Sequence, residues 1–482
     1  MRASRLLSLA FLVCVLLAGC TTNPVTGERQ LVSMMSAKEE AAAGAAAHPK
    51  IVAAFGGVYD NQKTGMYVAQ MVHRLAGASG RPVTYQLTVL DSPVVNAFAL
   101  PGGYVYVTRG LLALAGDEAE LASVLGHEIG HVDARHSAQR QTAAMGASVL
   151  GAVLGAVVGS QAVNQVVGVG GQGLLAGYSR DQEFEADALG VRALARAGYD
   201  PYAGASFLEK MGAEEDLKAH MAGGQRDADK PDWLASHPAT PARVAAAKSH
   251  AAETGAQPAT LPRNRDEYLS AIDGMIYGDS PAQGMVRGRE FLHPQMRFAF
   301  TAPRGFTLVN GAQAVGVQGP GKSVAKFDGA SKAAHTGIRE YLTSGWAARV
   351  QLAQVSEFQI NGMRAASAFA RIGDYQARLV AIEYSPTQVY RFLVGVLPAM
   401  QGAHAPLLER MVMSFRRLSA AEASAIKPDR IRIVTVRPGQ SAADLAARMS
   451  LPDFKEERFR VLNGLRPGDG LAPGMRVKIV SE

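Results

Sequence analysis

The sequence predicts a multidomain protein with a mostly helical first part that contains a small β-sheet, then an α+β part, then a small βααβ module. Three observations support this prediction. Apolar residues recur at helical spacing between residues 37 and 252, with one alternating stretch at 83–90. From about residue 291, runs of strand-like residues follow one another. Residues 431–480 read as strand, two short helices and strand. A chain of 482 residues has room for several domains.

Residues 1–19 have the features of a secretory signal, because two arginines precede an uncharged apolar run too short to span a bilayer. The run ends in LAGC at 17–20, which resembles the lipobox of bacterial lipoproteins. That resemblance implies that Cys20 carries acyl chains, and Thr21 after it resembles an outer-membrane sorting signal. An ordinary signal with a chance cysteine is the alternative. Residues 20–44 would then form a lipidated tether.

Charge and cysteine content exclude several classes of protein. Lys and Arg number 49 against 42 Asp and Glu, and the net charge of +7 is mild for this length. Basic residues form no stripe interleaved with aromatic residues, so no nucleic-acid partner is expected. The only cysteines are Cys14, inside the signal, and Cys20. The processed chain therefore has no cysteine pair for a disulfide and no cysteine-rich zinc site.

Residues 121–137 predict a helix that carries the motif His127-Glu128-Ile129-Gly130-His131. Helical positions four apart are rotated by about 40°, so His127 and His131 face the same side and could bind one Zn²⁺. Glu128 projects beside them, where it could accept a proton from a water molecule activated by the metal. The alternative is an amphipathic helix whose histidines merely lie at its surface.

The third ligand must come from another segment. A metzincin would have a glycine and a histidine at the positions that Ala134 and Ser137 occupy here. His136 follows His131 by five residues, so a continuing helix would rotate it well off the metal face.

Residues 96–107 predict two short strands around the turn Pro101-Gly102-Gly103. Because this hairpin comes just before the metal-binding helix, its first strand could be an edge to which an extended polypeptide substrate adds by main-chain hydrogen bonds. The residues of this candidate edge strand are Asn96, Ala97, Phe98 and Ala99. A purely structural hairpin is the alternative.

A charge-free, Gly- and Ala-rich stretch at 141–179 is long enough to cross a membrane, but its Gln, Asn and Gly residues disfavour an isolated span. We expect a lid or amphipathic flap over the active site, and contact with lipid stays open. A second helix then begins, on which Glu183 and Asp187 face one direction. Glu183 can supply the missing oxygen ligand, and Asp187 can accept the spare N–H of a ligating imidazole. Glu185 is the alternative ligand, and a charged, solvated helix face is the alternative to a site.

The hairpin, the HExxH motif and the ExxxD motif, in that order, resemble the HtpX and CAAX-prenyl-protease family of zinc metallopeptidases, in its periplasmic lipoprotein (BepA-like) branch. The resemblance covers roughly residues 45–252 and implies a mostly helical gluzincin-type domain, over about 45–285, with one Zn²⁺. The metal ligands and general base that it implies are His127, His131 and Glu183, with Glu128 as the base.

Two further features bear on this resemblance. Residues 233–238 and Arg243 match a His-Pro segment of that branch, in which His237 could occupy the open metal position or stabilise the oxyanion. An exposed histidine in a capping loop is the alternative. BepA-like members also carry helical TPR repeats, but no period of about 34 residues is found here. The part of this protein that recognises substrates must therefore differ from the TPR repeats of BepA-like members.

Residues 286–420 predict strands with flanking helices, an α+β sandwich. Residues 298–306 resemble the opening of PsbP/Mog-like domains. No cluster of catalytic residue types occurs in this part, so a binding or packing role is expected. In residues 428–482, Ser441 is a plausible helix N-cap, and the whole module resembles LysM, a βααβ fold that binds N-acetylglucosamine chains. A degenerate copy used for packing is the alternative.

The sequence therefore predicts a zinc endopeptidase of the bacterial periplasm, anchored to outer-membrane lipid through Cys20 and docked on peptidoglycan through its C-terminal module. Its substrates would be misfolded or unassembled envelope polypeptides. A non-enzymatic chaperone or assembly factor for outer-membrane proteins and a murein-binding structural lipoprotein are the alternatives.

Overall fold

The computed structural model describes residues 36–140, 177–221, 233, 237–238 and 240–482, and the backbone of two short paired strands, β1 (Cys20–Thr22) and β2 (Arg29–Leu31). The predictions for residues 1–19 and for most of 141–179 lie outside the described residues. The chain divides into two compact units, one formed by residues up to Tyr277 together with Arg430–Ser481, and one formed by Gly278–Asp429. The predicted limits of these parts were 45–285, 286–420 and 428–482.

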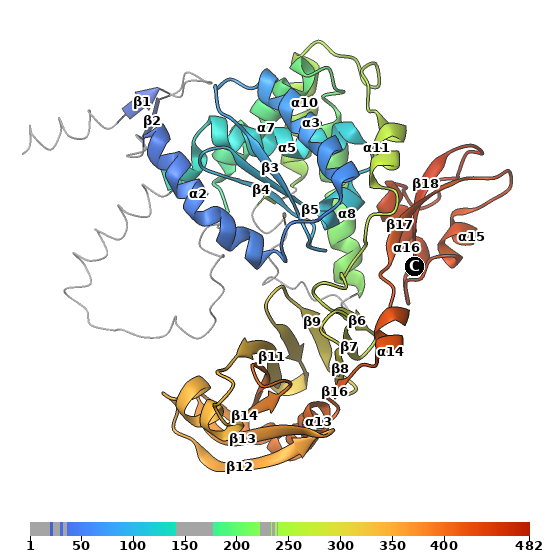
Figure 1. Ribbon diagram of the computed structural model, residues 1–482. Helices are drawn as coiled ribbons and strands as arrows, with labels where there is room; N and C mark the ends of the chain where they lie inside the picture. The colour runs from blue at the N-terminus through green and yellow to red at the C-terminus, as the bar shows by residue number, and fades with distance from the viewer. Residues whose placement is uncertain are drawn as a thin grey trace, which may run out of the picture. The chain divides into compact units, whose positions relative to one another are not determined.

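The first unit contains a three-stranded sheet in the order β3 (Gln86–Leu90), β5 (Tyr104–Thr108), β4 (Ala97–Leu100). Strand β3 is parallel to β5, and β4 is antiparallel to it. Alternate side chains of the strands point to opposite faces. Tyr106 therefore packs with α2 (Ala37–Ala54) on one face, while Val107 packs with α3 (Gln62–Ala78) and α5 on the other (Figure 1).

Helix α5 (Glu118–Asp133) is buried along its whole length, which disagrees with the alternative of an amphipathic helix that has its histidines at the surface. Its charged residues are buried together with partners. Glu120, for example, accepts hydrogen bonds from Lys210 Nζ at 2.5 Å and from the backbone N of Gly116 at 2.7 Å. The neighbouring helices are α4 (Arg109–Leu114), α7 (Arg180–Arg196), α8 (Ala203–Met221), α10 (Pro241–Glu253) and α11 (Arg265–Ile272).

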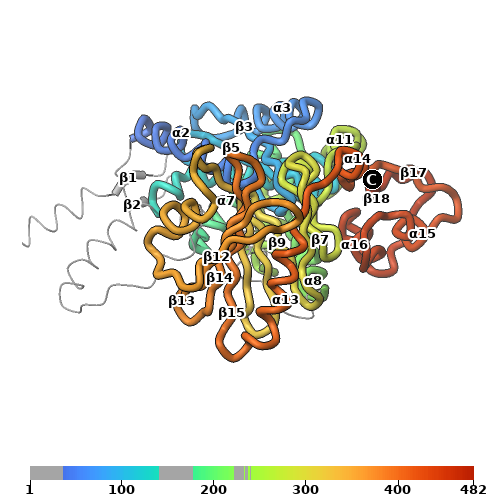
Figure 2. Tube along the Cα trace, turned by 60° about the horizontal axis from the view of Figure 1, so that its bottom comes forward, coloured from blue at the N-terminus to red at the C-terminus, as the bar shows by residue number. Residues whose placement is uncertain are grey.

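The C-terminal module has the predicted βααβ order: β17 (Arg430–Thr435), α15 (Ala442–Ala447), α16 (Lys455–Asn463) and β18 (Arg476–Ser481). The prediction that Ser441 caps the first helix is confirmed, since its side chain accepts the backbone N–H of Asp444 in a capping box. The module shares the hydrophobic core of the first unit, and Figure 2 shows it beside α11. Residues that it adds to this core are Ile431, Leu445, Phe459, Leu462 and Val477.

Lys478 forms hydrogen bonds between this module and the segment that precedes α5. It is fully buried, and its Nζ donates to the carbonyl oxygens of Ala113, Leu114 and Ala115 at 2.6, 3.3 and 2.8 Å. These carbonyls lie at the C-terminal end of α4, where helical carbonyls lack partners within the helix. The module is therefore a structural part of the first unit.

The second unit contains two antiparallel sheets, of seven strands in the order β12-β13-β14-β15-β11-β10-β9 and of four strands in the order β16-β8-β7-β6. A phenylalanine-rich core that includes Phe298, Phe327 and Phe415 is joined by α13 (Gln401–Met413). This unit also contains a short helix, α12 (Ile338–Glu340), which is followed by a π-helical turn at Tyr341–Trp346. The strands are β6 (Met285–Arg287), β7 (Glu290–His293), β8 (Phe298–Thr301), β9 (Thr307–Asn310), β10 (Val315–Gln318), β11 (Val324–Ser331), β12 (Ala353–Ile360), β13 (Met363–Ile372), β14 (Tyr375–Glu383), β15 (Gln388–Val396) and β16 (Arg416–Arg417), and a last helix is α14 (Ala420–Ala425).

Among the helices that the structure describes, none has both the length and the hydrophobicity needed to cross a bilayer.

Candidate metal centre

Four side chains from three segments converge beside α5. His127 and His131 are 4% and 1% exposed, and their Nε2 atoms lie 3.0 Å apart. Glu183, on the first turn of α7, places Oε1 3.5 Å from His131 Nε2 and Oε2 3.6 Å from His127 Nε2. His237 Nδ1 lies 2.8 Å from Glu183 Oε1 and 3.2 Å from His127 Nε2. One potential ligand atom from each of the four residues lies within 4.8 Å of all the others.

This group of donors fits a zinc ion. Imidazole nitrogens and a carboxylate oxygen are ligands that Zn²⁺ prefers. Glu183 Oε2 is buried, and it accepts no hydrogen bond from the residues that the structure describes, although Arg243 Nη1 lies 2.9 Å away. A buried carboxylate oxygen without a hydrogen bond is costly unless a cation completes its environment. Arg243 already places one positive charge beside this oxygen, and a divalent ion between the four side chains would be a second cationic partner for it.

The electrostatics of His131 and Glu183 favour the forms that bind metal, neutral imidazole and ionised carboxylate, whereas those of His127 favour the protonated ring. Burial lowers the pKa of His131 well below its ordinary value. Burial opposes ionisation of Glu183, but hydrogen bonds with His131 and His237 outweigh it and hold the pKa of this carboxyl below its ordinary value. For His127, burial is outweighed by the bond to Asp187, which raises the pKa of the imidazole.

Asp187 holds His127 from behind. Its Oδ1 lies 2.8 Å from His127 Nδ1, which leaves the Nε2 atom facing the other three donors. Arg243 of α10 forms a bidentate contact with Asp187. Its Nε donates to Asp187 Oδ2 and its Nη2 donates to Asp187 Oδ1, both at 2.7 Å. Such a carboxylate–histidine pair orients the ring and selects its tautomer.

Glu128 lies beside the donors, and its carboxylate lies close to Trp233 and His237. It is 1% exposed, and its Oε1 accepts a hydrogen bond from Trp233 Nε1 at 3.1 Å. His237 Nε2 is 3.6 Å from the same oxygen, and the Trp233 and His237 rings stack with centroids 4.9 Å apart. Burial raises the pKa of the Glu128 carboxyl. The motif at residues 233–238 did not predict this contact between Trp233 and Glu128.

Glycines allow α5 and α7 to approach closely enough for Glu183 to reach the histidines. A Cβ added to Gly190 would lie 2.9 Å from the backbone N of His127 and 3.1 Å from the carbonyl carbon of Gly126. A Cβ added to Gly130 would lie 3.0 Å from the carbonyl oxygen of Ala186. Because these atoms belong to the backbone, they cannot move aside without moving the helices.

A Gly190→Ala variant is therefore expected to bind Zn²⁺ about tenfold more weakly and to lose about 1–3 kcal/mol of stability, as overpacked cores do. Competition with a chromophoric chelator and thermal unfolding measure the two effects. Gly212→Ala in α8 is the matched control, because no atom of the described chain would lie within 4 Å of its new Cβ. Wild-type zinc affinity in Gly190→Ala would contradict the role of this contact.

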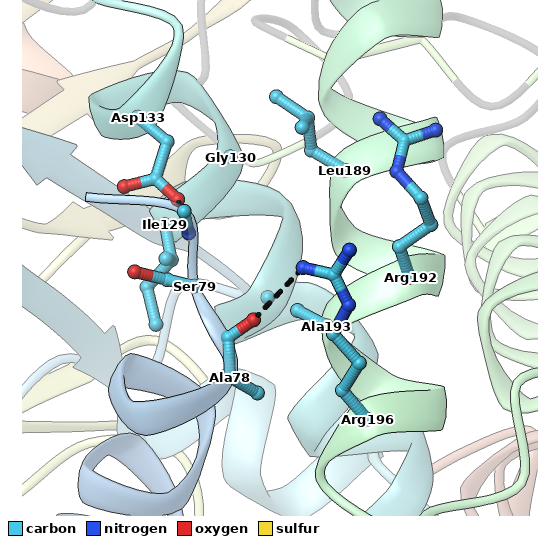
Figure 3. Close-up of a pocket in the computed structure, with 11 residues that line it drawn as sticks. Ala78, Ser79, Ile129, Gly130, Asp133, Leu189, Arg192, Ala193 and Arg196 are labelled. Atoms are coloured by element: carbon cyan, nitrogen blue, oxygen red, sulfur yellow. Dashed lines mark hydrogen bonds between the residues drawn. The ribbon is translucent and has the colours of Figure 1, made fainter. Parts of the chain in front are cut away.

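The opposite side of α5 borders a separate cavity of about 170 Å³ (Figure 3). Gly126, Ile129 and Asp133 line it from α5, and Arg192 and Arg196 line it from α7. These positions of α5 are rotated away from its two metal-facing histidines. The cavity therefore does not belong to the metal centre.

The candidate edge strand lies at the edge of the described three-stranded sheet, since β4 pairs with β5 on one side. The side chains of Asn96, Ala97, Phe98 and Ala99 are buried. The residue before them, Val95, accepts a hydrogen bond at its carbonyl oxygen from the backbone N of Trp233 at 3.0 Å. Because Trp233 also contacts Glu128, the start of the strand is connected to the metal centre.

His136 lies outside the four-residue cluster, but it contacts His131 on the side away from the other donors, which the sequence did not predict. Helix α5 ends at Asp133, and Arg135 has a φ of 61°, so the chain turns back instead of continuing the helix. His136 is fully buried, and its Nδ1 lies 2.7 Å from His131 Nδ1. Glu185, the alternative ligand, lies outside the four-residue cluster, with Oε2 3.1 Å from His136 Nε2.

Residues 62–251 match the family model of Peptidase family M48. Mitochondrial metalloendopeptidase OMA1 of Arabidopsis thaliana is 36% identical over 156 residues, which cover 32% of this chain and 29% of that protein. Beta-barrel assembly-enhancing proteases are 29% identical over 235 residues in Yersinia pestis (46% of each chain) and over 215 residues in Escherichia coli strain K12 (42% of each chain). The chain thus spans less than half the length of each of these relatives.

A solved structure of cyanobacterial PsbP from Synechocystis sp. PCC 6803 aligns with 28% of this chain and 98% of that chain, at 9% identity and a TM-score of 0.22.

The prediction of a metallopeptidase is confirmed at the level of the family, because the matched stretch contains HExxH, ExxxD and their convergent side chains. Together, the sequence matches and the buried His–His–Glu–His cluster show that residues 62–251 are similar to the metallopeptidases of peptidase family M48.

Proposed function

We propose that this protein is a zinc-dependent endopeptidase that cleaves misfolded or unassembled polypeptides of the bacterial envelope. The observation that carries the proposal is the convergence of His127, His131 and Glu183 in a buried group with Glu128 alongside. When bound there, Zn²⁺ would supply Lewis-acid activation of the scissile carbonyl and of a water molecule.

Glu128 would act as the general base and then as the general acid. Its carboxylate would accept the proton of the attacking water and return it to the leaving amine. Burial raises the pKa of this carboxyl, which makes it a stronger base than an exposed glutamate. The hydrogen bond from Trp233 Nε1 would hold the carboxylate in one orientation.

His237 would gate the site. In this conformation its Nδ1 lies among the potential ligand atoms, and its other nitrogen lies 3.6 Å from Glu128 Oε1. An imidazole in that place would compete with a substrate carbonyl for the fourth position, so His237 would have to move for turnover. Its ring could then stabilise the oxyanion, as the sequence suggested.

The substrate class and location rest on three further supports. Strand β4 offers an edge near the metal centre, and strand addition reads the backbone of a substrate rather than its sequence. Some relatives are named beta-barrel assembly-enhancing proteases, which points to envelope polypeptides. The lipobox ending at Cys20 would anchor the protein to the outer membrane in the periplasm, and the LysM-like module would contact peptidoglycan.

The test uses the full chain with and without metal. We expect about one Zn²⁺ per chain by metal analysis, and digestion of a reduced, unfolded protein but little digestion of the same protein when folded. Chelation should abolish digestion, and added Zn²⁺ should restore it. Digestion that survives complete removal of zinc would overturn the proposal, as would a chain that binds zinc but cleaves no unfolded polypeptide.

A further inference from the structure

The turn after α5 brings a second histidine to the back of His131. Arg135 adopts the left-handed conformation, and its backbone N donates to Val132 O at 3.1 Å. Its guanidinium is held by Glu40 of α2, with Nε and Nη2 at 2.7 and 2.6 Å from Oε1. Because Glu40 is only 5% exposed, this ion pair fixes the turn firmly. His136 is thereby directed to the Nδ1 atom of His131, on the side of that ring away from the other donors.

From this geometry, and given the zinc site of the proposed function, we propose that His136 and Glu185 form a positioning relay that holds His131 in the tautomer and orientation needed to bind metal. The relay is a chain of two contacts. His131 Nδ1 lies 2.7 Å from His136 Nδ1, and His136 Nε2 lies 3.1 Å from Glu185 Oε2. His136 itself is fully buried.

Only one arrangement of protons lets this chain serve a metal site. His131 must present the lone pair of Nε2 to the other donors, so its Nδ1 carries the proton and donates it to His136. His136 Nδ1 must then be an acceptor, which places the proton of this neutral ring on Nε2. Nε2 donates to the Glu185 carboxylate. One carboxylate therefore selects the tautomers of both rings.

The two metal-facing histidines are thus oriented by different devices. Asp187 contacts His127 directly at 2.8 Å, whereas Glu185 acts on His131 through His136. Tyr178 adds a second restraint, because its ring stacks on the His131 ring with centroids 3.9 Å apart and planes inclined by 17°. The sequence feature that carries the relay is Arg-His after the HExxH helix, with Glu185 two residues after Glu183.

The test measures zinc affinity, which does not depend on finding a substrate. His136→Leu should weaken Zn²⁺ binding about 10–100-fold, the usual effect of losing an outer partner of a ligand. His136→Asn should restore part of the affinity, because its amide can replace the Nδ1 contact to His131. Glu185→Gln, which removes the charge at a partly exposed position, should weaken binding less than His136→Leu does. Competition with a chromophoric chelator gives the constants.

The matched control is His404→Leu. His404 is also buried and hydrogen-bonded through Nδ1, to Ser323 at 2.7 Å, but it lies in the second unit. The zinc affinity of the His404→Leu variant should equal that of the wild-type protein. The visible spectrum of the Co²⁺-loaded protein should change in His136→Leu and Glu185→Gln but not in this control, and a merely structural role of His136 would leave that spectrum unchanged.

The outcomes separate this inference from the proposed function. Wild-type zinc affinity and an unchanged Co²⁺ spectrum in His136→Leu would overturn the relay, even if the enzyme is active. A wild type that binds zinc without cleaving would overturn the function and leave these affinities to decide the relay. If His136→Leu does not fold without metal, wild-type affinity in both His136→Asn and Glu185→Gln would overturn the relay.

Discussion

A Glu128→Gln variant is expected to keep its zinc and its thermal stability but to cleave unfolded polypeptide about 10²–10⁴-fold more slowly, the range that general-base catalysis contributes. The amide keeps the size of the carboxylate and can still accept the hydrogen bond from Trp233 Nε1. It cannot accept a proton from water, however. Initial rates of cleavage, with metal analysis of the same sample, measure the two properties separately.

The matched control for this variant is Glu209→Gln on α8. Glu209 is exposed and pairs with Lys248, so its loss should not change the rate. A Glu128→Gln rate within threefold of the wild type would contradict the role of Glu128 as base. If neither protein cleaves but both suppress aggregation of unfolded outer-membrane proteins equally, the chaperone alternative would be favoured.

Replacing Lys478 with Met is expected to lower the free energy of unfolding of the first unit by about 2–4 kcal/mol, because carbonyl groups lose their buried donor. The affected carbonyls belong to Ala113, Leu114 and Ala115, immediately before Asp117, whose side chain caps α5. The methionine side chain has a similar length but offers no N–H. Urea unfolding followed with and without zinc identifies the relevant transition, since only the unit that binds metal is stabilised by it.

Lys248→Met serves as the control for this experiment. Its ammonium forms an exposed ion pair with Glu209, and such pairs contribute about 0–1 kcal/mol. A Lys478→Met protein with unchanged unfolding would contradict the structural role of the C-terminal module. Separate unfolding of that module, with no effect on the zinc-sensitive transition, would contradict it as well.

Local patterns predicted much of the candidate site. His127, Glu128 and His131 share one helix, where spacing alone determines which side chains face the same direction. Glu183 and Asp187 share another for the same reason. The capping role of Ser441 also depends on residues within one turn, and the structure confirms it.

Other features arise from packing between distant segments. His136 was expected to lie off the metal face, and its contact with His131 Nδ1 was not predicted. That contact depends on the left-handed Arg135, which pairs with Glu40 of α2. The C-terminal module was expected to be a separate domain on the basis of its own βααβ pattern. Its contribution to the peptidase core depends on Lys478 meeting carbonyls more than three hundred residues earlier.

The sequence by itself determined which side chains carry the chemistry and which of them share a helix face, because backbone geometry sets those relations over one or two turns. Only the tertiary structure decided that Glu183 and His237 meet the two histidines, and that Glu185 is linked to His131 through His136. The reason is that contacts between side chains of separate segments depend on how closely the helices that carry them pack. Here glycines without side chains set that distance between α5 and α7.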